Sequence, residues 1–87
     1  MRSSQDPALL RALASELKAR RAALGISQDE LALTAGINRT FVAKLELAKT
    51  SPSLSSLFRL SVGLRVEPWE LIQAVQRRYD VERLTSV

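Results

Sequence analysis

Residues 25–46 read GISQDELALTAGINRTFVAKLE, and their capping and turn residues predict two short helices joined by a tight turn. Ser27 and Glu30 have the spacing of a capping box, in which each side chain bonds the amide of the other residue at a helix start. Gly36 predicts the end of this first helix, because glycine adopts the left-handed conformation without strain. Asn38 then caps the second helix. A turn this short sets the helices at a steep angle, so the outer face of the second helix projects and has the width to enter the major groove of B-DNA.

Three further helices flank this pair in the sequence. Pro7 suits the first turn of an amphipathic helix over residues 7–24. Ser53 is the expected cap of another helix, and Pro68 opens a last one that runs to about Tyr79. Residues 80–87 mix charged and apolar side chains, and they either prolong this last helix or fray. The apolar face expected for the helix after Ser53 comprises Leu54, Leu57, Phe58 and residues 60–64.

The length of 87 residues allows one domain with one modest core. No stretch alternates convincingly between apolar and polar residues at a period of two, so we expect no sheet. We therefore predict a compact all-α bundle of five helices that occupies residues 1–87, with its core over about residues 7–79 and frayed ends.

The composition limits the chemistry that the protein can perform. The sequence contains no Cys and no His, which excludes disulfides, thiolate metal sites, Cys nucleophiles and imidazole acid–base catalysis. No clustered carboxylates and no phosphate-cradling glycine loop suggest another active site, so we expect no enzyme, metal, cofactor or small-molecule substrate. No apolar run approaches the roughly 18 residues that span a bilayer, and residues 1–7 lack the apolar core of a secretion signal. We therefore expect a cytoplasmic protein with no membrane partner.

The charge of the chain favours a polyanionic partner. Thirteen Lys and Arg against nine Asp and Glu give a net charge of +4, although on a small domain this surplus also serves solubility. The distribution is more informative, because residues 37–58 hold three cations and a single acid, Glu46. A lone acid on a surface suited to phosphates needs a role of its own.

The segments GISQDELA (25–32), AGI (35–37) and LE (45–46), together with Val42, form a characteristic pattern of small, apolar and capping residues. This pattern resembles the Cro/repressor-type (XRE) helix-turn-helix family, and the resemblance extends over residues 13–71. It implies a lambda-repressor-like DNA-binding domain whose second and third helices form the helix-turn-helix. It also implies a bacterial or phage regulator of transcription that reads double-stranded DNA through the major groove.

The resemblance assigns the outer face of the third helix to base edges. The residues implied are Arg39, Thr40, Ala43 and Lys44. Arg39 can pair with O6 and N7 of guanine, Lys44 can reach guanine or a phosphate, and Thr40 can contact a phosphate or a thymine methyl group. Ala43 leaves room for close approach. Without the resemblance, Arg39 and Lys44 are ordinary solvated charges.

The resemblance also implies a set of contacts to the phosphate backbone. These residues are Gln28, Asn38, Lys49, Thr50 and Ser51. Gln28 would in addition brace the next helix, but it is also what an exposed helix start looks like. Asn38 is a cap first and a phosphate ligand second. The loop 49–51 suits a sugar-phosphate backbone, although surface loops in general have this composition.

The lone acid Glu46 is explained by the resemblance, which pairs it with Arg21 in a structural salt bridge that clamps the third helix against the first. Removing one partner of a shielded pair costs more than the pair contributes, so loss of Glu46 should loosen the fold. One residue departs from the pattern: where the family often has a left-handed glycine two positions after this Glu, the chain has Ala48. Because alanine disfavours that conformation, we expect the turn to shift by one residue or the third helix to run longer.

One recognition helix reads only a few base pairs, so a single copy of the chain recognises little sequence. Such proteins usually bind a two-fold operator as two copies, so we expect a homodimer on an inverted repeat. The resemblance implies a dimer seam on the fifth helix and the loop before it: Val66, Trp69, Ile72, Val75, Gln76 and Tyr79. Trp69 fits the core of the chain as well as it fits the seam.

The type of regulator is left open by the sequence. The stretch 38–42 looks like that of controller proteins of restriction-modification systems, and other stand-alone repressors or activators look similar. A protein-binding module, such as the antitoxin of a toxin–antitoxin pair with secondary DNA binding, is the alternative. The short tail after Tyr79 argues weakly for it.

Overall fold

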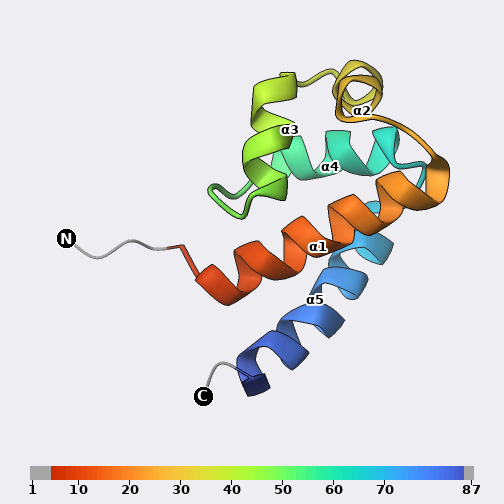
Figure 1. Cartoon of the computed structure of the whole chain (residues 1–87). Coiled ribbons are helices and arrows are strands. Elements are labelled where there is room, and N and C mark those ends of the chain that lie inside the picture. The colour runs from red at the N-terminus through yellow and green to blue at the C-terminus, as the bar shows by residue number, and fades with distance from the viewer. Residues whose placement is uncertain (1–4, 86–87) are drawn as a thin grey trace.

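The computed structural model describes residues 5–85, which form five helices and no strand (Figure 1). The all-α prediction is confirmed for this part of the chain. The expectation of frayed ends concerns in part residues 1–4 and 86–87, which lie outside the described residues. The helices are α1 (Pro7–Leu24), α2 (Gln28–Ala35), α3 (Arg39–Glu46), α4 (Leu54–Gly63) and α5 (Pro68–Thr85).

Side-chain caps fix where the first four helices begin. The capping box of α2 is complete: Ser27 Oγ accepts from the Glu30 amide at 3.0 Å, and Glu30 Oε1 accepts from the Ser27 amide at 3.1 Å. Asn38 and Ser53 cap α3 and α4 with their side-chain oxygens. Asp6 caps α1 in the same way, and the sequence analysis did not single it out.

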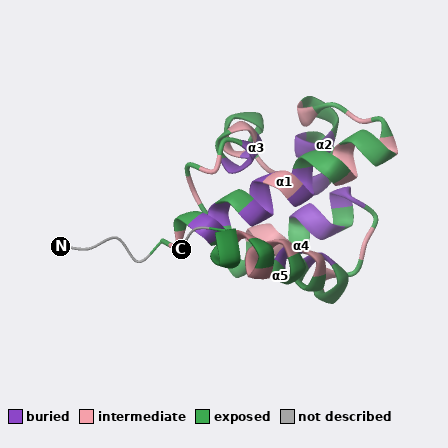
Figure 2. Ribbon diagram, turned by 60° about the horizontal axis from the view of Figure 1, so that its bottom comes forward, coloured by how far each residue is buried: buried purple, intermediate pink, exposed green. Residues whose placement is uncertain are grey.

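The core is built from one fully buried leucine in each helix. These leucines are Leu17, Leu31, Leu45, Leu60 and Leu71. α1 lies between α3 and α5, and α2 packs against α3 and α4, so the buried positions line the inner sides of the helices (Figures 1 and 2). α4 approaches α2 closely at Gly63, where a Cβ atom would lie 2.7 Å from Cδ1 of Leu31. An alanine at this position would have to displace the Leu31 side chain and would crowd Ala35, whose Cβ lies 3.1 Å from the added atom.

Four helices end in the same backbone turn, with a left-handed residue just beyond the helix. Gly25 and Gly36 take this conformation after α1 and α2, both at φ 69°. Ala48 and Arg65 take it after α3 and α4, both at φ 58°. Glycine carries no steric penalty here, whereas alanine and arginine do.

The expectation that Ala48 shifts the turn or lengthens α3 is therefore wrong. The Ala48 amide donates to the Leu45 carbonyl at 3.1 Å, and the Lys49 amide donates to the Lys44 carbonyl at 3.0 Å. These two bonds close the end of the helix as they would around a glycine, and they offset the cost of the alanine conformation.

α5 takes the longer of its two expected extents, and α4 differs from its predicted orientation. α5 continues to Thr85 because the sequence after Trp69 holds no Gly or Pro, and Arg83 pairs with Asp80 one turn earlier at 2.7 Å. In α4, the predicted apolar face is only partly buried: Leu54 is 69% and Phe58 49% exposed. Val62 is 67% exposed, and the spacing of these three residues by four positions places them on one outward stripe.

Candidate nucleic-acid interface

α2, the turn at residues 36–38 and α3 lie together on the surface, and packing and hydrogen bonds hold the turn between the two helices. Gly36 supplies the left-handed turn, and Ile37 packs against the core. Asn38 Oδ1 accepts from the Thr40 amide at 2.7 Å, which fixes the start of α3. Arg59 of α4 donates to the Gly36 carbonyl at 3.2 Å, so the neighbouring helix also holds the turn. Sequence analysis missed Arg59, because only the fold brings it to the turn.

The outer face of α3 carries the side chains assigned to base edges. Arg39, Thr40 and Lys44 are exposed, and Ala43 is half-buried. Residues 42 and 45, on the opposite side of the helix, have no exposed surface. The resulting face offers two cations and a hydroxyl around a small residue, on a helix that projects from the bundle (Figure 1).

Arg39 already has a partner on this surface. Its Nε lies 2.9 Å from Oδ1 of Asp29 in the first turn of α2, and the two side chains are 67% and 73% exposed. This ion pair was not predictable from the sequence, because rules on side-chain spacing cover pairs within one helix only.

Behind α3, Glu46 is buried and held from two helices. Arg21 Nε and Nη2 donate to its two carboxylate oxygens at 2.6 and 2.8 Å, and Arg21 Nη1 donates to the Ile26 carbonyl at 2.9 Å. Gln28 Nε2 donates to Glu46 Oε1 at 3.0 Å. Burial by itself would raise the pKa of Glu46, but the hydrogen bonds from Arg21 and Gln28 and the charges of Arg21 and Lys18 outweigh it and lower this pKa below 4.5. Glu46 therefore stays ionised and neutralised behind the outer face of α3.

The residues assigned to phosphates surround this face. Gln28 lies at the start of α2 with its amide group bound to Glu46, so it braces α3. The side-chain oxygen of Asn38 is used in the cap, which leaves its amide nitrogen as the group for a phosphate. Lys49 and Ser51 are exposed and Thr50 is half-buried, in the loop that follows α3.

A second buried carboxylate, which sequence analysis missed, joins α1 to α5. Glu16 is 7% exposed, and its oxygens accept from Arg20 at 2.5 Å and Arg78 at 2.7 Å. Burial acts to raise the pKa of Glu16, but the bonds from Arg78 and Arg20 prevail and lower it.

The six residues predicted for the dimer seam fall into two groups. Val75 is buried in the core, and Val66 and Tyr79 pack against it. Tyr79 also donates its hydroxyl hydrogen to Asp6. These three side chains pack within the chain itself, and their place in a dimer seam stays a prediction. The exposed members are Trp69, Ile72 and Gln76.

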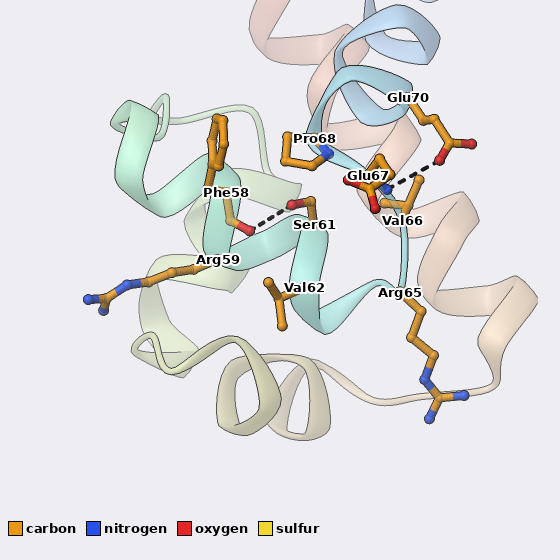
Figure 3. A pocket seen from close by; sticks show the side chains of 9 residues that line it. All are labelled: Phe58, Arg59, Ser61, Val62, Arg65, Val66, Glu67, Pro68 and Glu70. Carbon is orange, nitrogen blue, oxygen red and sulfur yellow. Dashed lines mark hydrogen bonds between the residues drawn. The ribbon is translucent and has the colours of Figure 1, made fainter.

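A groove runs between α4 and the start of α5 (Figure 3). Phe58 and Val62 of the outward stripe line it from α4, and Pro68 lines it from α5 (Figure 3). The full lining is Phe58, Arg59, Ser61, Val62, Arg65, Val66, Glu67, Pro68 and Glu70. The large apolar side chains exposed on α4 and on the first turns of α5, namely Leu54, Phe58, Val62, Trp69 and Ile72, are called the α4–α5 face below.

Among residues 5–85, no group of three or more acids is placed to hold a metal ion. None of the five helices is long and apolar enough to cross a membrane over the same residues.

Comparison with known proteins gives a consistent set of matches. Residues 17–71 match the family model described as Helix-turn-helix. An uncharacterized HTH-type transcriptional regulator of Haemophilus influenzae is 39% identical over 53 residues, which are 61% of this chain and 54% of that protein. The chain thus spans about half the length of this curated relative.

Two solved structures are similar in fold and in sequence. The restriction-modification controller protein C.AhdI from Aeromonas hydrophila is 34% identical, with a TM-score of 0.68 over 71% of this chain and 94% of its own. A point mutant of the restriction-modification controller protein C.Esp1396I is 25% identical, with a TM-score of 0.73 over 88% of this chain and 92% of its own.

Proposed function

This chain belongs to the helix-turn-helix family of the Cro/repressor (XRE) type, and we propose that it is a sequence-specific, double-stranded-DNA-binding regulator of transcription. The observation that carries the proposal is the outer face of α3, which presents Arg39, Thr40, Ala43 and Lys44 on a helix braced from behind by a neutralised acid. The names of the relatives support it, since one is an HTH-type transcriptional regulator and two are restriction-modification controllers. We assign no catalytic activity and place the protein in the cytoplasm with its DNA.

Each part of the surface has a role in this proposal. α3 enters the major groove, where Arg39 reads guanine and Lys44 reads guanine or a phosphate. Thr40 and Ala43 allow close contact with a thymine methyl group or the backbone. The amides of Gln28 and Asn38 and the loop 49–51 hold phosphates on either side of α3, and so fix its register in the groove.

We further propose that two copies bind one operator through the α4–α5 face. Phe58, Val62 and Trp69 expose large apolar surface on two helices that pack together. Such a cluster on a small domain is typical of a protein contact. A two-fold axis at this face would present two copies of α3 to successive major grooves, about 34–36 Å apart.

The test is selection from random duplex DNA by the full chain at moderate salt, with Arg39→Ala as the matched variant. We expect an inverted repeat whose half-site centres lie about one helical turn apart. Arg39→Ala should relax one position in each half-site, by about 1–3 kcal/mol. Weak, unselective binding that falls steeply with added salt would contradict the proposal, because phosphate attraction alone would then explain it. A search for a protein partner would follow that result.

A further inference from the structure

Asp29 is an acid on the surface that the proposed function brings against DNA. Its carboxylate is 73% exposed beside the base-reading helix, where it would face the negative charge of the phosphates. Stability gives little reason for it, because an exposed ion pair contributes almost nothing. Its place at the first turn of α2 suits the helix dipole, but Glu30, next to it, already supplies an acid there.

The geometry of the pair points to a role in recognition. Asp29 Oδ1 contacts Nε of Arg39, on the side of the guanidinium that faces its own chain. Guanine needs two parallel donors for its O6 and N7 atoms. A carboxylate at Nε leaves Nη1 and Nη2 to serve as these donors, and it limits the rotations of a long side chain that would otherwise have to be ordered on binding.

We propose that Asp29 is a positioning residue that sets the base specificity of Arg39, an inference that rests on the proposed function. It acts in two ways. It holds the guanidinium in an orientation that pairs with guanine, and its negative charge weakens attraction to phosphates at every other sequence. Both effects widen the ratio between specific and non-specific affinity, which is the quantity that matters to a regulator.

The experiment measures that ratio for the parent chain and for Asp29→Ala, Asp29→Asn, Arg39→Ala and the double variant Asp29→Ala/Arg39→Ala. Three DNA duplexes serve as probes: the selected operator, a variant operator and a random-sequence duplex. In the variant operator, the base pair that the parent prefers and Arg39→Ala does not is replaced by another. Asp80→Ala is the matched control, because Asp80 pairs with Arg83 at 2.7 Å on the exposed surface of α5. Each ratio compares two affinities of one preparation, so a small loss of stability in a variant does not move it.

We expect Asp29→Ala to bind the random duplex about three- to tenfold more tightly and to discriminate at the Arg39 base pair about five- to tenfold less than the parent. Asp29→Asn should share the first effect and only part of the second, because its amide oxygen can still accept from Arg39 Nε. In the Arg39→Ala background, removal of Asp29 should leave discrimination unchanged. Asp80→Ala should behave as the parent in both measurements.

Full discrimination at that base pair in Asp29→Ala would overturn the inference while leaving the proposed function intact. An equal loss of discrimination with and without Arg39 would also overturn it, since Asp29 would then act independently of Arg39. A parent chain that prefers no sequence would instead overturn the proposed function, and the inference with it.

Discussion

A carboxylate close to bound DNA is repelled by the phosphates unless a cation neutralises it, and Glu46 satisfies this condition with Arg21. Glu46→Gln leaves the Arg21 guanidinium beside a neutral amide in a shielded place. Because the Arg21 side chain keeps 20% of its surface exposed, we expect a loss of about 2–4 kcal/mol, below the upper limit for a fully buried pair. Urea unfolding followed by circular dichroism measures this change.

The exposed pair Arg83–Asp80 is the control for that measurement. Asp80→Asn removes an equally short ion pair in open solvent, so its unfolding free energy should fall by less than about 1 kcal/mol. Glu46→Gln with the stability of the parent would show that the Arg21 contact is not a structural clamp.

The sequence shows which residues carry a charge, but it does not show which charged residues pair with each other. The pairing of Arg21 with Glu46 came from the resemblance to a family, since no spacing rule joins residues of α1 and α3. Glu16 and Arg78 lie 62 positions apart, and only the packing of α1 on α5 joins them. Ion pairs within a helix follow a spacing of three or four residues, whereas pairs between helices depend on the completed fold.

Ala48 ends α3 in a left-handed conformation that an L-residue adopts at a cost. Its φ of 58° carries a steric cost that glycine avoids, and the two hydrogen bonds of the turn do not depend on the side chain. Ala48→Gly should therefore stabilise the protein by about 0.5–1 kcal/mol, after subtraction of the entropy that glycine adds to the unfolded chain. The midpoint of thermal unfolding measures the effect.

Gly25 allows the reverse substitution at the end of α1. A Cβ atom there meets nothing within 4 Å, so Gly25→Ala tests the backbone alone. It should destabilise the protein by about 1 kcal/mol. If the thermal midpoints of Ala48→Gly and Gly25→Ala shift by equal amounts in opposite directions, both changes are due to the left-handed conformation. If Ala48→Gly instead lowers the midpoint, the alanine methyl group has a packing role.

The helices themselves were largely predictable, because their starts depend on local caps and turns. Ser27, Asn38 and Ser53 begin α2, α3 and α4 as expected. The outward stripe of α4 was not predictable. Which side of an apolar helix faces the core is decided by its neighbours, and Leu54 and Phe58 remain 69% and 49% exposed once α4 has packed against α2 and α5.

For the molecule as a whole, three carboxylates link stability to pH. Hydrogen bonding from Tyr79 lowers the pKa of Asp6, and the arginine partners lower the pKa of Glu16 and of Glu46 despite their burial. The folded chain thus holds fewer protons than the unfolded chain in the acid range. This stabilisation is complete above the unfolded values of 3.8 for Asp and 4.5 for Glu, and it is lost as pH falls through the lower folded values.

We therefore expect the thermal midpoint to be level from neutral pH to about pH 5 and to fall steeply below it. Glu16→Gln removes one of the three linked groups, so its midpoint should start lower and fall less steeply over the acid range. A parallel fall in the variant and the parent would show that Glu16 does not contribute to the acid transition.

Assembly of two copies depends on which apolar surface the second copy covers. Val62 on the α4–α5 face and Val81 near the end of α5 have the same chemistry and similar exposure, 67% and 61%. A glutamate at the seam would meet its own symmetry mate across the two-fold axis, so Val62→Glu should reduce the dimer to a monomer and weaken binding to the inverted repeat more than to a single half-site. Val81→Glu should change neither the dimer nor the binding to the inverted repeat.

Sedimentation of the free chains and of their operator complexes measures both effects. If Val62→Glu and Val81→Glu sediment alike, with two copies on the operator, the seam lies elsewhere. One parent copy on the operator would instead reject the homodimer.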